Sequence, residues 1–457
     1  MRYATSAAFL LACGCMASAE PLDEQVVQLL SEGKYAEAEP LAKRAVDIAI
    51  RDHGADHPDT AASVSNLASV YSNQGRYDAA EPLYRQSLAI IEAKYGHDHE
   101  NTATLHSNLA ALYEERGDTR AAVSHHKQAF AIRAKTLGPD HPDTATSLSN
   151  LAESYRTQHK YAEAEPLSKR ALAIREQVLG PDHPDIAISC TILALLYQAQ
   201  GKYAEAEPLF KRAVVVTEKT LGPDHPDTAT SLTNLAAFYN ARGKDAEAEP
   251  LSRRALAIRE RVLGPDHPET ATSLSNLGAI CGAQGKYGEA EQLIERSLAI
   301  REKTLGPDHP DTALSLHNLA LLYHHQGKYA EAEPLSQRAL AIRERALVPD
   351  HPDTAASLNN LASLYQAEGN FAKAEPLFKR AVAINEKALG PDHQDTATSL
   401  NNLAAMYSAT GKYAAAEQLY TRALAIAEKV LGADHPRTIK TRDNLSAMRR
   451  KRDQITK

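Results

Sequence analysis

The sequence repeats every 42 residues, with no insertion between the first and last copies. A linker histidine stands at positions 57, 99, 141, 183, 225, 267, 309, 351, 393 and 435. An asparagine follows nine residues later in every copy except one, where Ile192 replaces it. A chain of equal units contacts mainly its nearest neighbours, so it folds as a linear stack rather than a globule. The period therefore favours an extended binding surface over an enclosed reaction site.

A typical repeat predicts two helices. Gly222-Pro223 ends one helix, because glycine accepts a left-handed conformation and proline cannot continue the helix. We expect Asp224 or Asp227 to cap the next helix through its carboxylate. Apolar residues then recur at helical spacing from Leu232 to Tyr239, and a second helical pattern follows the next glycine. Each unit is a hairpin that buries its apolar faces only by stacking on its neighbours.

This pattern predicts an array of about ten hairpins over residues 20–436, the first one short. Residues 437–457 carry eight basic side chains against Asp443 and Asp453, which predicts a charged capping helix. Since the whole chain has a net charge of −7, the rest is strongly acidic. An acidic body lacks the clustered lysine and arginine that phosphate contacts need, so we expect no nucleic-acid binding.

The first 19 residues are typical of a secretory signal peptide. Arg2 precedes a short apolar stretch, and Ala17-Ser18-Ala19 resembles a cleavage site. We expect export to the periplasm or the extracellular space, with cleavage after Ala19. The residues around Cys13 and Cys15 also resemble a lipoprotein box, so lipidation there is the alternative. We expect membrane contact only in that case.

The run Asn-Leu-Ala-x-x-Tyr-x-x-x-Gly-Lys-x-x-x-Ala, as at 234–248, resembles a tetratricopeptide repeat. The 42-residue spacing and the Leu-Gly-Pro-Asp-His-Pro-Asp linker are similar to the longer repeats of kinesin light chain. This resemblance implies an all-α, right-handed superhelical solenoid of antiparallel helix pairs, whose first helices line a concave groove for extended peptides. It stops at the repeats, because a signal-like segment stands where kinesin light chain has a coiled coil. We therefore do not expect a motor-cargo role.

The resemblance also implies which residues face the groove. The asparagine before the Leu-Ala pair of each first helix would offer its amide to a peptide backbone. The matching positions are Asn66, Asn108, Asn150, Asn234, Asn276, Asn318, Asn360 and Asn402. Alternatively, each amide bonds only to the adjacent repeat.

One repeat departs from the pattern and predicts an apolar pocket. Ile188, Ile192 and Leu195 lie at i, i+4 and i+7 and share the face that carries the asparagine in other repeats. We expect them to accept a hydrophobic anchor of the ligand. Tighter local packing is the other interpretation.

The sequence contains no phosphate-binding loop, His-Glu-x-x-His pair or serine elbow, so we expect no enzyme, cofactor or metal site. The linker histidines are spaced too far apart to converge on an ion, which favours a role in the turns. The predicted function is a protein-interaction scaffold. The alternative is an array that associates with its own copies or is lipid-anchored in the cell envelope.

Overall fold

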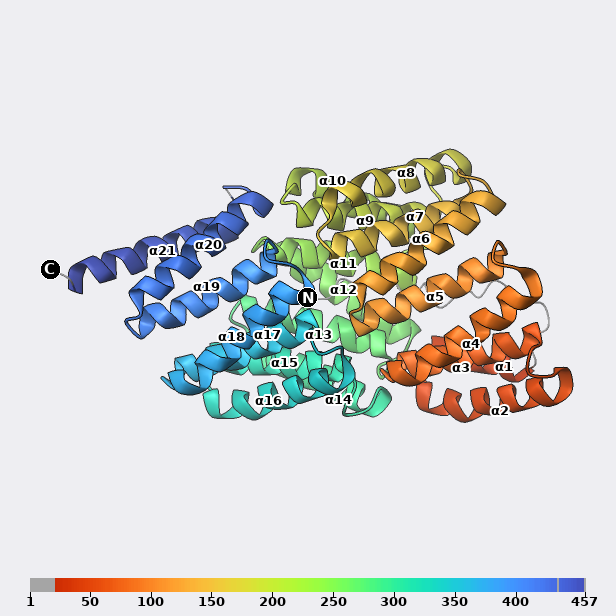
Figure 1. The fold of residues 1–457 in the computed structure, drawn as a ribbon, viewed down its shortest axis with the longest axis horizontal. Helices are drawn as coiled ribbons and strands as arrows, with labels where there is room; N and C mark the ends of the chain where they lie inside the picture. The colour runs from red at the N-terminus through yellow and green to blue at the C-terminus, as the bar shows by residue number, and fades with distance from the viewer. Residues whose placement is uncertain (1–20, 434, 456–457) are drawn as a thin grey trace. The chain divides into compact units, whose positions relative to one another are not determined.

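The computed structural model describes residues 21–433 and 435–455 (Figure 1). Over these residues the chain forms 21 α-helices and no strand. The helices with odd numbers open the hairpins: α1 (Pro21–Ser31), α3 (Pro58–Asn73), α5 (Glu100–Arg116), α7 (Pro142–Thr157), α9 (Pro184–Ala199), α11 (Pro226–Ala241), α13 (Pro268–Ala283), α15 (Pro310–His325), α17 (Pro352–Ala367), α19 (Gln394–Ala409) and α21 (Pro436–Ile455). The even helices close them: α2 (Tyr35–His53), α4 (Tyr77–Tyr95), α6 (Thr119–Thr136), α8 (Tyr161–Leu179), α10 (Tyr203–Thr220), α12 (Asp245–Val262), α14 (Tyr287–Thr304), α16 (Tyr329–Ala346), α18 (Phe371–Ala388) and α20 (Tyr413–Leu431).

The chain divides into two compact units, residues 1–315 and 316–457, and each is described by itself. Both units are built from the same antiparallel hairpins, in which each odd helix packs on the even helix that follows it. The first odd helix, α1, has 11 residues, whereas α3 has 16. The predicted signal peptide and Cys13 and Cys15 lie outside the described residues. No helix among the described residues is long and apolar enough to span a membrane.

The linker histidines cap the odd helices. Nδ1 of His225 accepts a hydrogen bond from the backbone N–H of Asp227 at 3.2 Å, and His141 and His183 do the same for the residue two positions on. The expected aspartate cap is therefore wrong. Because proline forces the preceding residue into extended backbone, the histidine takes the cap position, with φ −78° and ψ 145° at His225.

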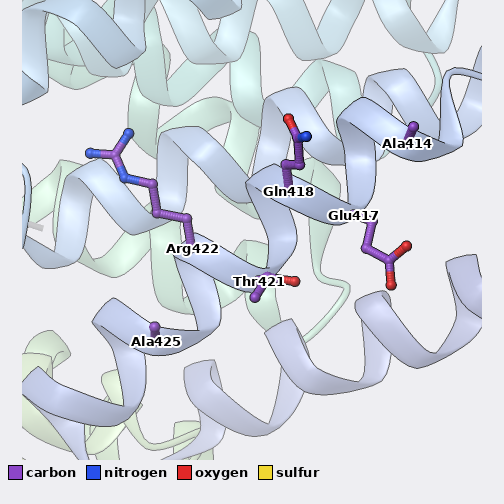
Figure 2. A pocket seen from close by; sticks show the side chains of 6 residues that line it. All are labelled: Ala414, Glu417, Gln418, Thr421, Arg422 and Ala425. Atoms are coloured by element: carbon purple, nitrogen blue, oxygen red, sulfur yellow. The ribbon is translucent and has the colours of Figure 1, made fainter.

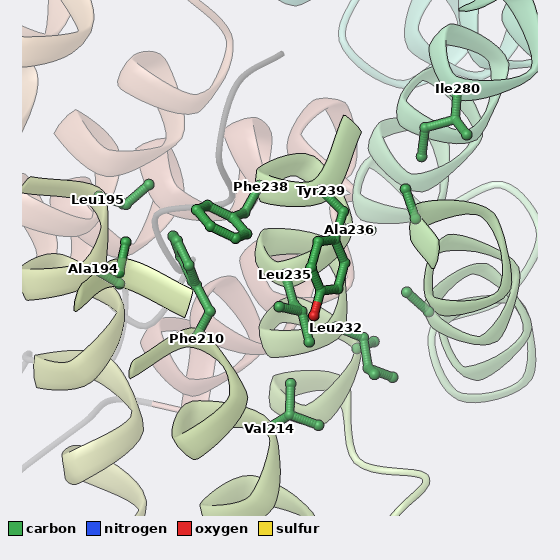
Figure 3. Packing of buried hydrophobic residues seen from close by; sticks show 14 of the residues in the cluster. Ala194, Leu195, Phe210, Val214, Leu232, Leu235, Ala236, Phe238, Tyr239 and Ile280 are labelled. Carbon is green, nitrogen blue, oxygen red and sulfur yellow. The ribbon is translucent and has the colours of Figure 1, made fainter. Parts of the chain in front are cut away.

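Apolar side chains from neighbouring hairpins interlock to form the core. In the first unit, Phe210 of α10 packs against Phe238 of α11, with ring centroids 5.2 Å apart (Figure 3). The same cluster includes Leu195 of α9 and Ile280 of α13, so it spans three successive hairpins. Stacking therefore buries what a single hairpin leaves open.

Buried arginines tie successive hairpins together from within. Five even helices carry one at the same position: Arg133, Arg175, Arg259, Arg301 and Arg343. Arg259 of α12 is 1% exposed and donates to Ser273 of α13 at 2.7 Å and to Thr230 of α11 at 3.0 Å. One guanidinium thus bonds to two consecutive odd helices.

Ion pairs link the even helices on the other side of the stack. Arg296 of α14 pairs with Glu260 of α12 at 2.6 Å. Lys286, just before α14, pairs with Glu249 of α12 at 2.8 Å. Hydrogen bonds from Lys286 and Arg253 lower the pKa of Glu249 to about 2. The charges of the even helices are therefore largely engaged with each other.

Candidate peptide-binding face

The odd helices form a continuous surface in each unit, which we call the odd-helix face. Several pairs of consecutive odd helices contact each other directly, as α7 does with α9, α9 with α11 and α17 with α19. Among the helices that the structure describes, no two successive even helices pack against each other to the same extent. The odd helices therefore lie on the side toward which each run of hairpins bends, because elements on an inner wall are closer together.

The asparagines predicted to face a groove differ in exposure. Four are buried, namely Asn66, Asn150, Asn234 and Asn276, at 8%, 6%, 2% and 7%. The other four, Asn108, Asn318, Asn360 and Asn402, are partly exposed. Thus half of this set has little surface to offer a ligand.

Three of the asparagines that stand nine residues after a linker histidine bond to the preceding odd helix. Nδ2 of Asn66 donates to Asp23 Oδ1 of α1 at 2.8 Å. Asn360 Nδ2 lies 2.9 Å from a ring nitrogen of His317, and Asn444 donates to Asn401 at 3.1 Å. In all three, the partner lies 43 residues earlier in the chain. At these positions the asparagine therefore joins adjacent repeats, as the alternative interpretation expected.

The three residues of the predicted apolar pocket differ in exposure. Ile188 is 37% exposed and Ile192 is partly exposed, so both are accessible on the odd-helix face of α9. Leu195 is 2% exposed and packs in the core cluster beside Phe210 and Phe238 (Figure 3). Leu195 therefore does not line an open pocket, because side chains of α10 and α11 cover it.

The residues around the asparagines are mostly small and uncharged. Four positions before the asparagine, most repeats carry threonine or alanine, as at Thr146, Thr230 and Thr272. Their hydroxyls accept hydrogen bonds from the buried arginines, for instance from Arg175 to Thr146 at 2.8 Å. The charged residues Glu153 and Arg156 of α7 form an ion pair with each other at 2.6 Å. The face thus offers hydroxyl, amide and methyl groups and little free charge.

One hollow and one histidine cluster outside these positions are shallow or already engaged. The hollow in Figure 2 is lined by six residues that all belong to α20. His53, His57 and Asp59 bring three possible metal-ligating atoms within 4.8 Å of one another. However, His57 Nδ1 already accepts the backbone N–H of Asp59 at 3.2 Å, as in other repeats. The His53 ring stacks on His57 as Tyr95 stacks on His99, so we assign no ion there.

Both buried cysteines belong to the core. Cys190 and Cys281 are free thiols with no exposed surface. Burial raises the pKa of each to about 11. Since the thiolate is the reactive form, neither residue has the properties of a nucleophile.

Stacked antiparallel helix pairs with a continuous inner surface define the class of helical-repeat solenoids. Within that class, the chain belongs to the tetratricopeptide repeat family, whose model matches ten overlapping stretches between residues 27 and 457. The 42-residue repeat is of the kinesin light chain type. No curated protein matches the chain.

Three solved structures show the extent of the similarity. A kinesin light chain from Podosopora anserina with nearly identical TPR-like repeats is 35% identical, with a TM-score of 0.38, over 45% of this chain and 97% of that one. BtubC from P. vanneervenii is 24% identical, with a TM-score of 0.40, over 54% and 94%. A Rap protein complexed with Competence and Sporulation Factor is 15% identical, with a TM-score of 0.54, over 80% and 97%, and shares the fold.

Proposed function

We propose that this tetratricopeptide repeat scaffold binds an extended, largely uncharged segment of a partner protein along its odd-helix face. The observation that carries the proposal is the division of charge. The even helices pair their charges with one another, as in Arg296–Glu260, whereas the odd-helix face presents hydroxyl, amide and methyl groups. An extended backbone needs donors and acceptors at regular intervals, and a preformed array provides them at a low entropic cost.

The apolar contact in this proposal comes from Ile188 and Ile192. Both replace polar residues, since the next repeat has Thr230 and Asn234 in their places. Two accessible isoleucines on adjacent turns of one helix form a small apolar patch for a hydrophobic side chain of the partner. Of the asparagines, the partly exposed Asn108, Asn318 and Asn402 are the ones proposed to touch the bound chain, since the amide of Asn360 is engaged with His317.

A random-peptide display library selected on the mature protein tests this function. We expect the selected peptides to lose at least about tenfold in affinity for the I188T/I192N variant, which restores the residues of the next repeat. Val215, 59% exposed on even helix α10, provides the matched control, and V215T should bind like wild type. Peptides that bind I188T/I192N normally, or that lose binding to V215T, would refute the proposed site.

We also propose that the protein is exported and cleaved after Ala19, on the sequence pattern of residues 1–19. Intact-mass analysis of the protein from its native host tests this directly. A mature chain that begins at Glu20 supports export as a free protein. A chain that begins at Cys13 or Cys15 with an added lipid mass supports the anchored alternative, and a chain that retains Met1 refutes both.

A further inference from the structure

Two loops of the first unit pack on helix starts that lie far along the chain. We call the glycine turn after an odd helix the loop, and the His-Pro pair at the start of an odd helix the corner. The Gly33 loop lies against Pro268, and the Gly75 loop lies against Pro310. In both contacts the two residues are 235 positions apart. The two contacts are thus the same interaction, displaced by one repeat.

The fit depends on the absence of a side chain in the loop. A Cβ on Gly33 would lie 2.5 Å from Cδ of Pro268, and one on Gly75 would lie 2.9 Å from Cδ of Pro310. Both distances are shorter than a real contact allows. The flat prolyl ring therefore rests directly on the loop backbone.

A hydrogen bond adds direction to this contact. Nδ1 of His267 accepts the backbone N–H of Glu269, so in the neutral ring the proton is on Nε2. That Nε2 lies 3.2 Å from the carbonyl oxygen of Ser31, the last residue of α1, and donates to it. A carbonyl at a helix end has no partner within its own helix, so the corner supplies one.

The chain also contains corners and loops that do not take part in such a contact, and we call these unfilled. The corners His141-Pro142, His183-Pro184 and His225-Pro226 have histidine side chains that are 40% exposed. Each of these three histidines uses Nδ1 as its helix cap, so its Nε2–H is the available donor. These corners therefore have the same prolyl ring and the same imidazole N–H donor that contact Gly33 and Ser31.

Unfilled loops lie toward the other end of the chain. Gly243, Gly285, Gly327, Gly369 and Gly411 are exposed, and no described atom lies within 4 Å of a Cβ built on any of them. Gly243 has φ +69°, the same as Gly33 in the filled contact. In the two filled contacts the corner lies 235 residues after the loop. A corner 235 residues after Gly243, or after any of the later loops, would lie beyond residue 457, so the chain itself provides no such corner for them.

From these observations we infer that the protein associates head to tail with a second copy of itself, the loops of one chain docking on the free corners at 142, 184 and 226 of the next. The contact is heterologous, since the two surfaces differ, and several equal contacts in register add their affinities. This inference goes beyond the peptide-binding function and does not require it.

Light scattering of the mature protein over a concentration series tests the inference. We expect the weight-average mass to rise with concentration for wild type. In P142E/P184E/P226E the dissociation constant should increase at least about tenfold. The substitution is compatible with the fold, because Glu100 occupies this position in α5. The matched control, P139E/P181E/P223E, adds the same charge to exposed prolines in the same three linkers and should associate like wild type.

A mixing experiment tests the direction of the contact. In the loop variant, all five free glycines become asparagine, which tolerates positive φ; His159 already occupies this loop position with φ 56°. Corner and loop variants should each be monomeric and folded by circular dichroism, and their mixture should form a dimer through the one intact pair of surfaces. A wild type that stays monomeric at every concentration, a corner variant that associates normally, or a mixture that stays monomeric would overturn the inference.

Discussion

The first prediction concerns the buried arginines, because Arg259 joins three helices through one charged group. Arg259→Ala removes the hydrogen bonds to Ser273 and Thr230 and empties the space of the side-chain stem. The substitution removes two of the three stem methylenes, Cγ and Cδ, each worth about 0.8 kcal/mol when buried. The lost hydrogen bonds add to this cost, whereas release of a desolvated cation offsets part of it. We expect the free energy of unfolding of the α11–α13 region to fall by about 2–4 kcal/mol.

Arg259→Met separates packing from charge. Methionine fills a similar volume and keeps the stem packing. The ion pair of Arg259 with Glu269 at 3.0 Å is lost, but Glu269 is 33% exposed, so water can solvate its carboxylate. We therefore expect Arg259→Met to cost no more than about 1 kcal/mol. Thr217 stands at this position in α10, which shows that the array tolerates a residue without charge there.

Hydrogen exchange of the amides in α12 and α13 is the appropriate assay, since a linear array opens locally rather than as one unit. The control is Arg254→Ala on the same helix. Its side chain is 41% exposed and pairs with Glu218, so the loss should stay below about 1 kcal/mol. If Arg259→Met proves as damaging as Arg259→Ala, the argument that stem packing dominates is refuted.

Three further predictions concern titration, capping and surface charge. Burial, and then the charges of His106 and Arg85, lowers the pKa of His125 to about 4. The stabilisation that comes from the neutral ring is therefore complete above the unfolded pKa of about 6.5 and is lost as the pH falls toward 4. The fall in melting temperature between pH 7 and pH 5 should be smaller in His125→Gln than in wild type. His141→Ala removes the acceptor for the N–H of Asp143 and should cost about 1 kcal/mol in urea unfolding, whereas His141→Asp should retain most of the stability. A double-mutant cycle on Arg296 and Glu260 should give a coupling below about 1 kcal/mol, and a larger value would show that the even-helix ion pairs are not solvent-screened.

The period of the sequence was enough to predict the hairpins, because equal spacing of apolar residues and glycines leaves one way to stack them. The histidine cap could also have been predicted. Proline constrains the residue before it to extended backbone, and that residue is the histidine in most linkers. The aspartates drew attention because carboxylates are the more usual caps.

The candidate site was less predictable, because it depends on how neighbouring helices cross. Ile188, Ile192 and Leu195 share a helical face, yet Phe238 of the next hairpin covers only Leu195. The bond of Asn66 to Asp23 joins residues 43 positions apart. A 42-residue period gives no reason for that one-residue offset, which arises from the way successive odd helices cross.

The last prediction concerns two glycines whose environments also depend on how neighbouring helices pack. Gly278 of α13 and Gly288 of α14 both stand where the preceding repeat has alanine, at Ala236 and Ala246. Helix propensity alone predicts that changing either glycine to alanine stabilises the protein, by up to about 1 kcal/mol. The structure distinguishes them. A Cβ on Gly288 has no described atom within 4 Å, whereas one on Gly278 would lie 2.6 Å from Cγ1 of Ile294.

Gly288→Ala should therefore raise the free energy of unfolding, and Gly278→Ala should lower it by about 1 kcal/mol, because overpacking a core costs more than the helix gains. Ile294 stands where the preceding repeat has Ser252. An Ile294→Ser background removes the nearest obstruction and leaves the carbonyl oxygen of Ala290 at 3.3 Å. Because the preceding repeat already combines Ala236 with Ser252, Gly278→Ala should become stabilising in that background. Urea unfolding of the four proteins in this cycle measures the reversal of sign. A Gly278→Ala variant that is more stable than wild type would show that Ile294 moves aside freely, and that the core between α13 and α14 is looser than its packing indicates.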